Sequence, residues 1–165
     1  MRLRKLEIKD APYMLEWMHD SDVIRYMKKD FSAMTIEDCA SFIKSCGDEH
    51  ENIHRAIVND NDEYLGTVSL KNINNTRKDA EFAITIRKCA MGTGVSSYGI
   101  KNIIKYGFEN IGLESIYWYV SKENIRAIKF YDKNGYKRAT LDKLFKTFEY
   151  TDKLIKSYVW YQVLK

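Results

Sequence analysis

The sequence contains one short motif of a kind suited to binding phosphate groups. Met91-Gly92-Thr93-Gly94-Val95-Ser96 lies between an apolar run and a helical pattern of isoleucines. Glycines let the backbone come close to a ligand, and the free N–H groups at the start of the following helix attract a pyrophosphate. The motif lacks the Gly-Lys-Ser/Thr of a P-loop and the third glycine of the dinucleotide-binding fingerprint. Taken alone, it is equally compatible with an ordinary turn from a strand to a helix.

A second motif follows about 30 residues later, at 124–136, with one predicted strand between the two. Asn124 stands at its start, and Tyr131 and Lys133 lie in its second half. An asparagine at this place is also compatible with a plain helix N-cap, and Tyr131 with a core aromatic. Together, however, the two motifs resemble the acyl-CoA signatures of the GNAT N-acetyltransferase superfamily, Gln/Arg-x-x-Gly-x-Gly/Ala and Asn-x-x-Ala-x-x-x-Tyr.

The resemblance covers nearly the whole chain and is nearest to the branch that acetylates ribosomal-protein N-termini and polyamines. Members of that branch typically open with Leu-Arg-x-Leu, as residues 3–6 do here, and carry an Ala-Glu pair near the middle strand, as residues 80–81 do. Two positions depart from the pattern, because Met91 replaces a Gln or Arg and Ser96 replaces a Gly or Ala. Backbone N–H groups make most of these contacts and serine is small, so we expect acetyl-CoA to bind.

The resemblance implies direct transfer of an acetyl group from acetyl-CoA to an amine. The amine must lose a proton, the carbonyl oxygen must be stabilised as it gains charge, and the leaving thiolate benefits from an acid. Tyr131 matches the family tyrosine at the thiol sulfur and is the expected general acid. The expected cofactor contacts are the strand before the glycine turn, the turn itself and the second motif: Ile84, Thr85, Ile86, residues 91–96, Asn124 and Lys133.

Glu81 is the candidate base, acting directly or through a water, because it matches the glutamate of the Ala-Glu pair. A strand glutamate is also compatible with a merely exposed face. His19, His50 and His54 have a titration range suited to a base and are alternatives. For these histidines we expect surface positions.

The acceptor is expected to lie against the first helices, with Trp17, His19, Tyr26 and Met27 on one wall and residues 144–150 on the other. The same side chains are compatible with helix-face core. The resemblance implies acetylation of a small-molecule amine or a peptide N-terminus. A nucleotide-linked amino sugar is an alternative acceptor, and a CoA-binding module without turnover is an alternative of another class.

The apolar pattern predicts the elements that must position these residues. Strands are expected over 1–8, 53–58, 64–70, 80–86, 115–120, 136–147 and 157–164, and helices begin near residues 11, 22, 35, 95 and 124. The helix that begins near residue 35 is expected to start with a capping box at Thr35. This order matches a single α/β (α+β) GNAT domain over residues 1–165. Its mixed central sheet would have about seven strands, splayed at the centre, with about four flanking helices.

Composition sets the remaining limits. The 165 residues are 45% hydrophobic and 13% aromatic with one proline, which excludes disorder and low-complexity structure. No apolar run is long enough to span a bilayer and the first residues are charged, so we expect a cytoplasmic protein that binds no membrane. The three cysteines are not in metal-ligand spacing, and no metal is expected.

Basic charge gathers at the end of the chain. Residues 122–165 hold eleven Lys or Arg against five Asp or Glu. Aromatic residues interleave with this charge, but they follow strand alternation and no recognition motif is present, so no nucleic-acid partner is expected. Arg126, Lys129 and Lys133 suit the phosphates of CoA instead. The resemblance is compatible with a homodimer.

Overall fold

A computed structural model of the chain describes residues 1–139 and 152–165. One mixed sheet runs through it, with six strands in sequential order. All neighbouring strands are antiparallel except β4 and β5, which are parallel. The strands are β1 (Arg2–Lys5), β2 (Ile53–Val58), β3 (Tyr64–Asn74), β4 (Asp79–Ile86), β5 (Ser115–Ser121) and β6 (Tyr158–Leu164).

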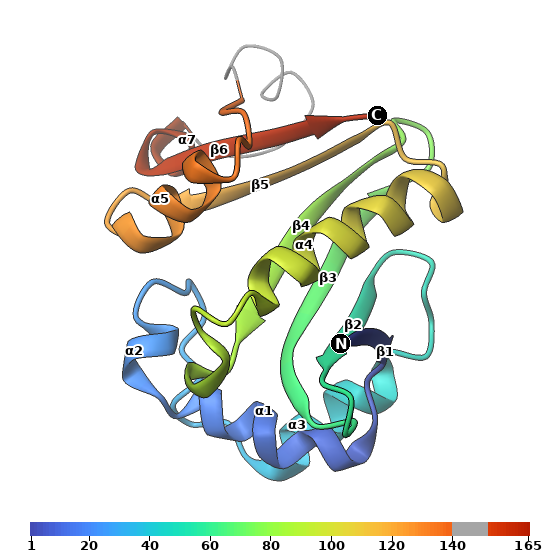
Figure 1. Cartoon of the computed structure of the whole chain (residues 1–165), viewed down its shortest axis with the longest axis vertical. Helices are drawn as coiled ribbons and strands as arrows, with labels where there is room; N and C mark the ends of the chain where they lie inside the picture. Colours follow the sequence, from blue (N-terminus) through green and yellow to red (C-terminus); the bar gives the residue numbers. More distant parts are fainter. Residues whose placement is uncertain (140–151) are drawn as a thin grey trace.

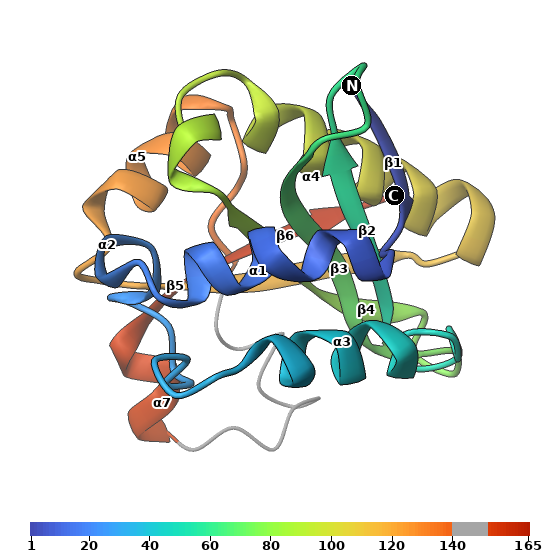
Figure 2. The same ribbon diagram turned by 90° about the horizontal axis from the view of Figure 1, so that it is seen from below.

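Helices cover both faces of the sheet. Figure 2 shows α4 and α5 on one side of the strands and α3 and α7 on the other. Three short helical turns connect the elements: η1 (Ile8–Asp10), η2 (Lys88–Ala90) and η3 (Gly107–Ile111). The α-helices are α1 (Ala11–Met18), α2 (Ser21–Ile24), α3 (Ile36–Ser45), α4 (Val95–Tyr106), α5 (Ile125–Lys133) and α7 (Asp152–Ser157).

Strand alternation divides the interior into separate clusters. On β4, Phe82 and Ile86 pack with α4 and α5, and on β5 Trp118 joins the same cluster. Met14 of α1 and Cys39 of α3 belong to a second cluster on the other face. Strands β2 and β3 therefore present one set of side chains to α4 and the alternate set to α1 and α3, whereas Tyr117 of β5 and Trp160 of β6 form a third cluster.

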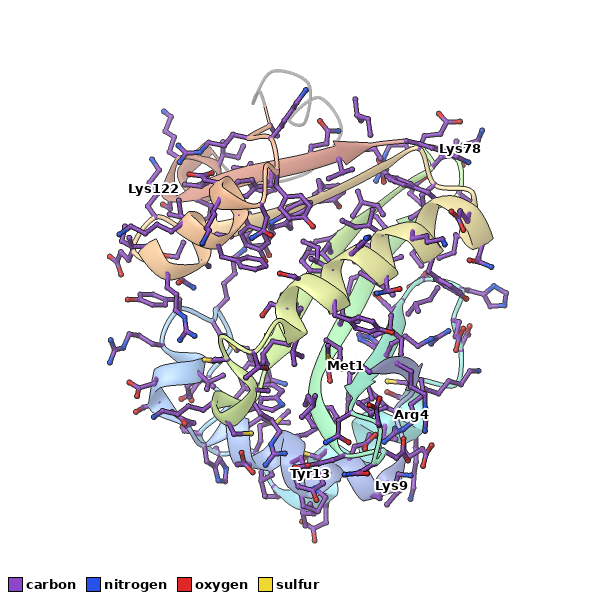
Figure 3. All side chains as sticks on the ribbon, viewed as in Figure 1. Met1, Arg4, Lys9, Tyr13, Lys78 and Lys122 are labelled. Carbon is purple, nitrogen blue, oxygen red and sulfur yellow. The ribbon has the colours of Figure 1, made fainter. Side chains whose placement is uncertain are left out.

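The arginine of the Leu-Arg-x-Leu opening has a structural role. Arg4, labelled in Figure 3, pairs through both terminal nitrogens with the carboxylate of Asp10, at 2.7 and 2.8 Å, and Asp10 is only 1% exposed. Its Nε also donates to Asp62 at 2.8 Å. Bidentate pairing of this kind is directional. It fixes β1 to the start of α1 and to the turn between β2 and β3.

Much of the predicted order is confirmed. The capping box at Thr35 is present, with the hydroxyl accepting from Asp38 N at 3.2 Å and the Asp38 carboxylate accepting from Thr35 N at 2.8 Å. Strands β2 and β3 form an antiparallel hairpin at the predicted positions. However, β3 continues past the predicted end at residue 70 as far as Asn74, because its backbone still pairs with Asp79.

The strand and helix counts differ from the prediction. The described residues contain six strands and six α-helices, where about seven and about four were expected. In the predicted strand 136–147 only Arg138 forms an isolated bridge, to Tyr161, and the part from residue 140 lies outside the described residues. Segment 152–157 forms α7, too short a helix to leave a periodic apolar pattern. No helix within the described ranges is long and apolar enough to cross a membrane.

The close approach of β3 to β4 at Gly66 allows a test of the pairing register between these two strands. A Cβ on Gly66 would lie 2.4 Å from the Thr85 carbonyl oxygen and 2.8 Å from Ile86 Cδ1. We expect Gly66→Ala to lower the free energy of unfolding by about 1–3 kcal/mol, measured by urea denaturation. Gly47→Ala is the control, because its Cβ would meet only the Lys44 carbonyl, at 3.7 Å. Equal stability of the two variants would contradict this packing.

Candidate active site

The sheet opens between its two parallel strands. In the described structure β4 and β5 pair only from Asp79–Glu81 to Ser115–Tyr117, although both strands continue beyond. Figure 1 shows the two strands diverging from that point. Between them lies a cleft of about 870 Å³, called the β4–β5 cleft. Three residues expected to contact the cofactor line it: Ile84, Thr85 and Ile86.

The glycine turn borders this cleft at the start of α4. Gly92 and Gly94 have φ angles of 82° and 89°, in the left-handed region, and a Cβ on either would meet nothing within 4 Å. Met91 and Ser96 line the cleft with them. Because the first N–H groups of a helix have no partner in the helix, the start of α4 presents donors beside open space. This arrangement suits an anionic group.

Tyr131 belongs to an aromatic cluster at the edge of the cleft. Its ring centroid lies 5.3 Å from that of Trp118 and 5.1 Å from that of Tyr161. The side chain is 6% exposed, and its hydroxyl has no hydrogen-bond partner within the described residues. Burial raises the pKa of Tyr131 above its ordinary value, and the neighbouring Tyr136 and Tyr161 raise it further. The phenol therefore stays protonated at neutral pH.

Trp118 of β5 adds a second open donor. It is 2% exposed and lines the cleft. Its indole Nε1 is the one buried side-chain N or O atom among the described residues with no hydrogen-bond partner. An unpaired buried donor costs about 1–3 kcal/mol, so a ligand group that accepts from it is favoured.

Glu81 alternates with Phe82 on β4 and so faces away from α4 and α5. Its Oε1 lies 2.7 Å from Lys71 Nζ, and Oε2 accepts from Asn72 Nδ2 at 3.3 Å. Glu81 is 4% exposed, so the reading as an exposed strand face is wrong. A lysine and an amide fix this carboxylate in place.

A second hollow of about 310 Å³ lies on the Glu81 side of the sheet and is called the α1–α3 cavity. Ala83, Ile84 and Thr85 line both hollows, so they adjoin across β4. Trp17 lines the cavity as well as packing in the core, and its Nε1 donates to the Tyr64 hydroxyl at 3.2 Å. The position of Trp17 is therefore compatible both with a wall of the acceptor site and with a helix-face core residue.

His54 also lines the α1–α3 cavity, which corrects the expectation of a surface position. Its Nδ1 lies 2.8 Å from Ser69 Oγ, and its ring packs edge-on against Phe42. Burial lowers the pKa of His54, and the charges of Lys71 and Arg55 lower it further. The imidazole is therefore neutral at neutral pH and able to accept a proton.

The other predicted residues divide into two groups. Tyr26 and Met27 line the β4–β5 cleft. Asn124 lines it too and also caps α5, accepting from Ala127 N at 3.1 Å. Four residues line neither hollow: Thr93, Val95, Lys133 and His19.

Local contacts explain some of these positions. Thr93 donates its hydroxyl to the Ala90 carbonyl at 2.7 Å, and Val95 is buried in the core. His19 Nε2 lies 2.9 Å from the Met34 carbonyl oxygen and is exposed. The ligand contacts expected of these side chains remain predictions.

Sequence reasoning overlooked two features of the site. Strand alternation at 115–120 places Trp118 on the face opposite Tyr117 and Tyr119, and this signal could have shown that it faces the cleft. Lys28 lies between α2 and α3 at the cleft lining, and no pattern in the sequence indicates it.

Known proteins are similar to this chain in sequence and in fold. Residues 1–137 match the acetyltransferase (GNAT) domain family. Spermidine N(1)-acetyltransferase of Escherichia coli is 32% identical over 82% of this chain and 72% of its own length. Acetyltransferase PseH of Campylobacter jejuni is 26% identical over 86% of this chain and 85% of its own.

A solved structure supports the fold. Vibrio cholerae spermidine N-acetyltransferase in complex with CoA and spermine superimposes with a TM-score of 0.80, at 20% identity, over 99% of this chain and 94% of that one. The chain therefore belongs to the GNAT acetyltransferase family. It is an N-acetyltransferase, and acetyl-CoA is its acyl donor.

The described residues fit this cofactor. The open backbone edge of residues 82–86 suits pantetheine, and the space in front of Gly92 and Gly94 suits the pyrophosphate. Arg126 Nη1 lies 3.2 Å from Met91 Sδ, which puts a cation beside the turn. Donors and charge thus lie along the same side of the cleft.

The glycine turn allows a matched test of cofactor binding. We expect Gly94→Ala to weaken acetyl-CoA binding about tenfold, measured by calorimetry, because the methyl group enters the space in front of α4. Gly112→Ala is the control, since Gly112 has a φ of 81° and equally empty surroundings but lies outside the cleft lining. Both variants place an alanine at a positive φ. Equal affinities in the two would remove Gly94 from the binding site.

Proposed function

We propose that this enzyme acetylates the primary amine of a small molecule or a peptide N-terminus, with Tyr131 as general acid and Glu81 as base. One observation carries the proposal: a protonated phenol without a partner and a fixed carboxylate lie on opposite faces of the sheet beside the opening of β4 from β5. The names of the relatives from Escherichia coli and Vibrio cholerae support an amine acceptor.

Tyr131 supplies the proton that the leaving group needs. Acetyl-CoA, when bound, supplies a thioester whose carbon–sulfur bond breaks as the carbon–nitrogen bond forms. Tyr131 donates its phenolic proton to the departing sulfur, and its raised pKa keeps that proton in place until then. Trp118 Nε1 and the open β4 backbone offer the donors for the carbonyl oxygen.

Glu81 takes the proton that the amine loses, directly or through a water. Lys71 and Asn72 hold the carboxylate in one position, which limits the reorganisation needed when the acceptor arrives. The acceptor enters from the side of the α1–α3 cavity, because α4 and α5 cover the other face. The neutral imidazole of His54, on the same side, is the alternative base.

Replacement of Tyr131 tests the acid. We expect Tyr131→Phe to lower kcat at least 100-fold, as for loss of a general acid, with acetyl-CoA affinity unchanged. Release of free thiol measures the rate, and calorimetry measures the affinity. Tyr136→Phe is the control, because Tyr136 packs on the same cluster and is absent from the cleft lining. Equal losses in both variants would assign the effect to packing.

Replacement of Glu81 tests the base. We expect Glu81→Gln to lower kcat about 100-fold below neutral pH and to lose less at high pH, where the free amine is abundant without a base. Glutamine still contacts Lys71 and Asn72, so the fold is preserved. His54→Gln is the comparison. Full activity of Glu81→Gln across pH, with a loss in His54→Gln, would transfer the role to His54.

A further inference from the structure

The acceptor side of the active site carries more positive than negative charge. Lys29 lines both hollows, and Lys28 and Lys71 line the β4–β5 cleft. Three carboxylates line the same hollows: that of Glu81 pairs with Lys71, that of Asp38 caps α3 at Thr35, and that of Asp22 pairs with Arg25 and Lys88. Within the described residues, this leaves Lys28 and Lys29 without an ion-pair partner.

Lys28 is held by neutral groups. Its Nζ donates to the Tyr119 hydroxyl at 3.1 Å and stands 4.2 Å from the centre of the Tyr119 ring and 5.0 Å from that of Tyr158. Desolvation lowers the pKa of Lys28, the charge of Glu81 raises it, and that of Lys71 lowers it. Rings and a hydroxyl fix the position of this ammonium group, and no carboxylate of the described residues lies within ion-pair distance of it.

The cofactor does not account for Lys28. Tyr119 alternates with Trp118 on β5 and belongs to the cluster on the face away from α4 and α5. The glycine turn and Arg126 lie on the α4 and α5 side, where they suit the cofactor phosphates. Lys28 therefore faces the side from which the acceptor enters.

We propose that the acceptor is a primary amine that carries a carboxylate or phosphate near its amino group, and that Lys28 binds this anion. The inference rests on the proposed function. A polyamine would bring further positive charge to a site that already has an excess of it. The acceptor class thus differs from that named for the Escherichia coli relative.

Matched amines test the proposal. The first pair is glucosamine and glucosamine 6-phosphate, and the second is a dipeptide amide and the free dipeptide, which carries a carboxylate. Spermidine is the polycationic comparison. We expect the anionic member of at least one pair to be favoured roughly five- to tenfold in kcat/KM, from release of free thiol. The favoured pair identifies phosphate or carboxylate as the source of the anion.

Lys28→Gln should abolish this preference and leave acetyl-CoA affinity unchanged. Lys101→Gln, on the exposed side of α4, should keep it. Preferred turnover of spermidine, or a preference that survives in Lys28→Gln, would overturn the inference and leave the proposed function standing.

A binding measurement separates the two proposals. Calorimetry with the favoured anionic amine and CoA-loaded protein should show binding that depends on Lys28. Such binding without thiol release from any amine would support the anion site and overturn the proposed function. Absence of Lys28-dependent binding would overturn the anion site.

Discussion

The separation of two parallel strands shapes the rest of this enzyme. Strands β4 and β5 share a ladder over only three residues each, and the aromatic rings of Trp118 and Tyr131 line the cleft where they diverge. A strand edge that leaves the ladder inside a protein must find other partners for its N–H and C=O groups. The unpaired backbone groups of β4 and the unpaired indole N–H of Trp118 therefore favour a ligand that hydrogen-bonds to them.

Alternation along β4 gives that opening two chemically different faces. Phe82 and Ile86 face α4 and α5, where the glycine turn presents backbone N–H donors and Arg126 presents a positive charge. Glu81 lies on the opposite face of β4, the face that carries the α1–α3 cavity, and it lines the β4–β5 cleft. One strand thus separates the side that suits an anionic cofactor from the side proposed for the acceptor, and it keeps the proposed acid apart from the proposed base.

Features that depend on local sequence could be predicted, and those that depend on long-range contacts could not. The capping box at Thr35, the left-handed turn of Gly92 and Gly94 and the cap of α5 each follow from a few neighbouring residues. Burial of His54 depends on Ser69 and on Phe42 of a different element, which no local pattern specifies. The same holds for Lys28, whose hydrogen-bond partner Tyr119 lies 91 residues away on β5.

The charge on the acceptor side and the proton transfer are connected. An amine attacks only in its neutral form, and nearby cations such as Lys28 and Lys71 favour that form because they disfavour a further positive charge. A site built for a polyamine needs carboxylates to hold the charge, and these favour the protonated amine instead. An acceptor that brings its own anion satisfies Lys28 and leaves the amine close to cations. Recognition of the acceptor and activation of its amine then rely on the same lysines.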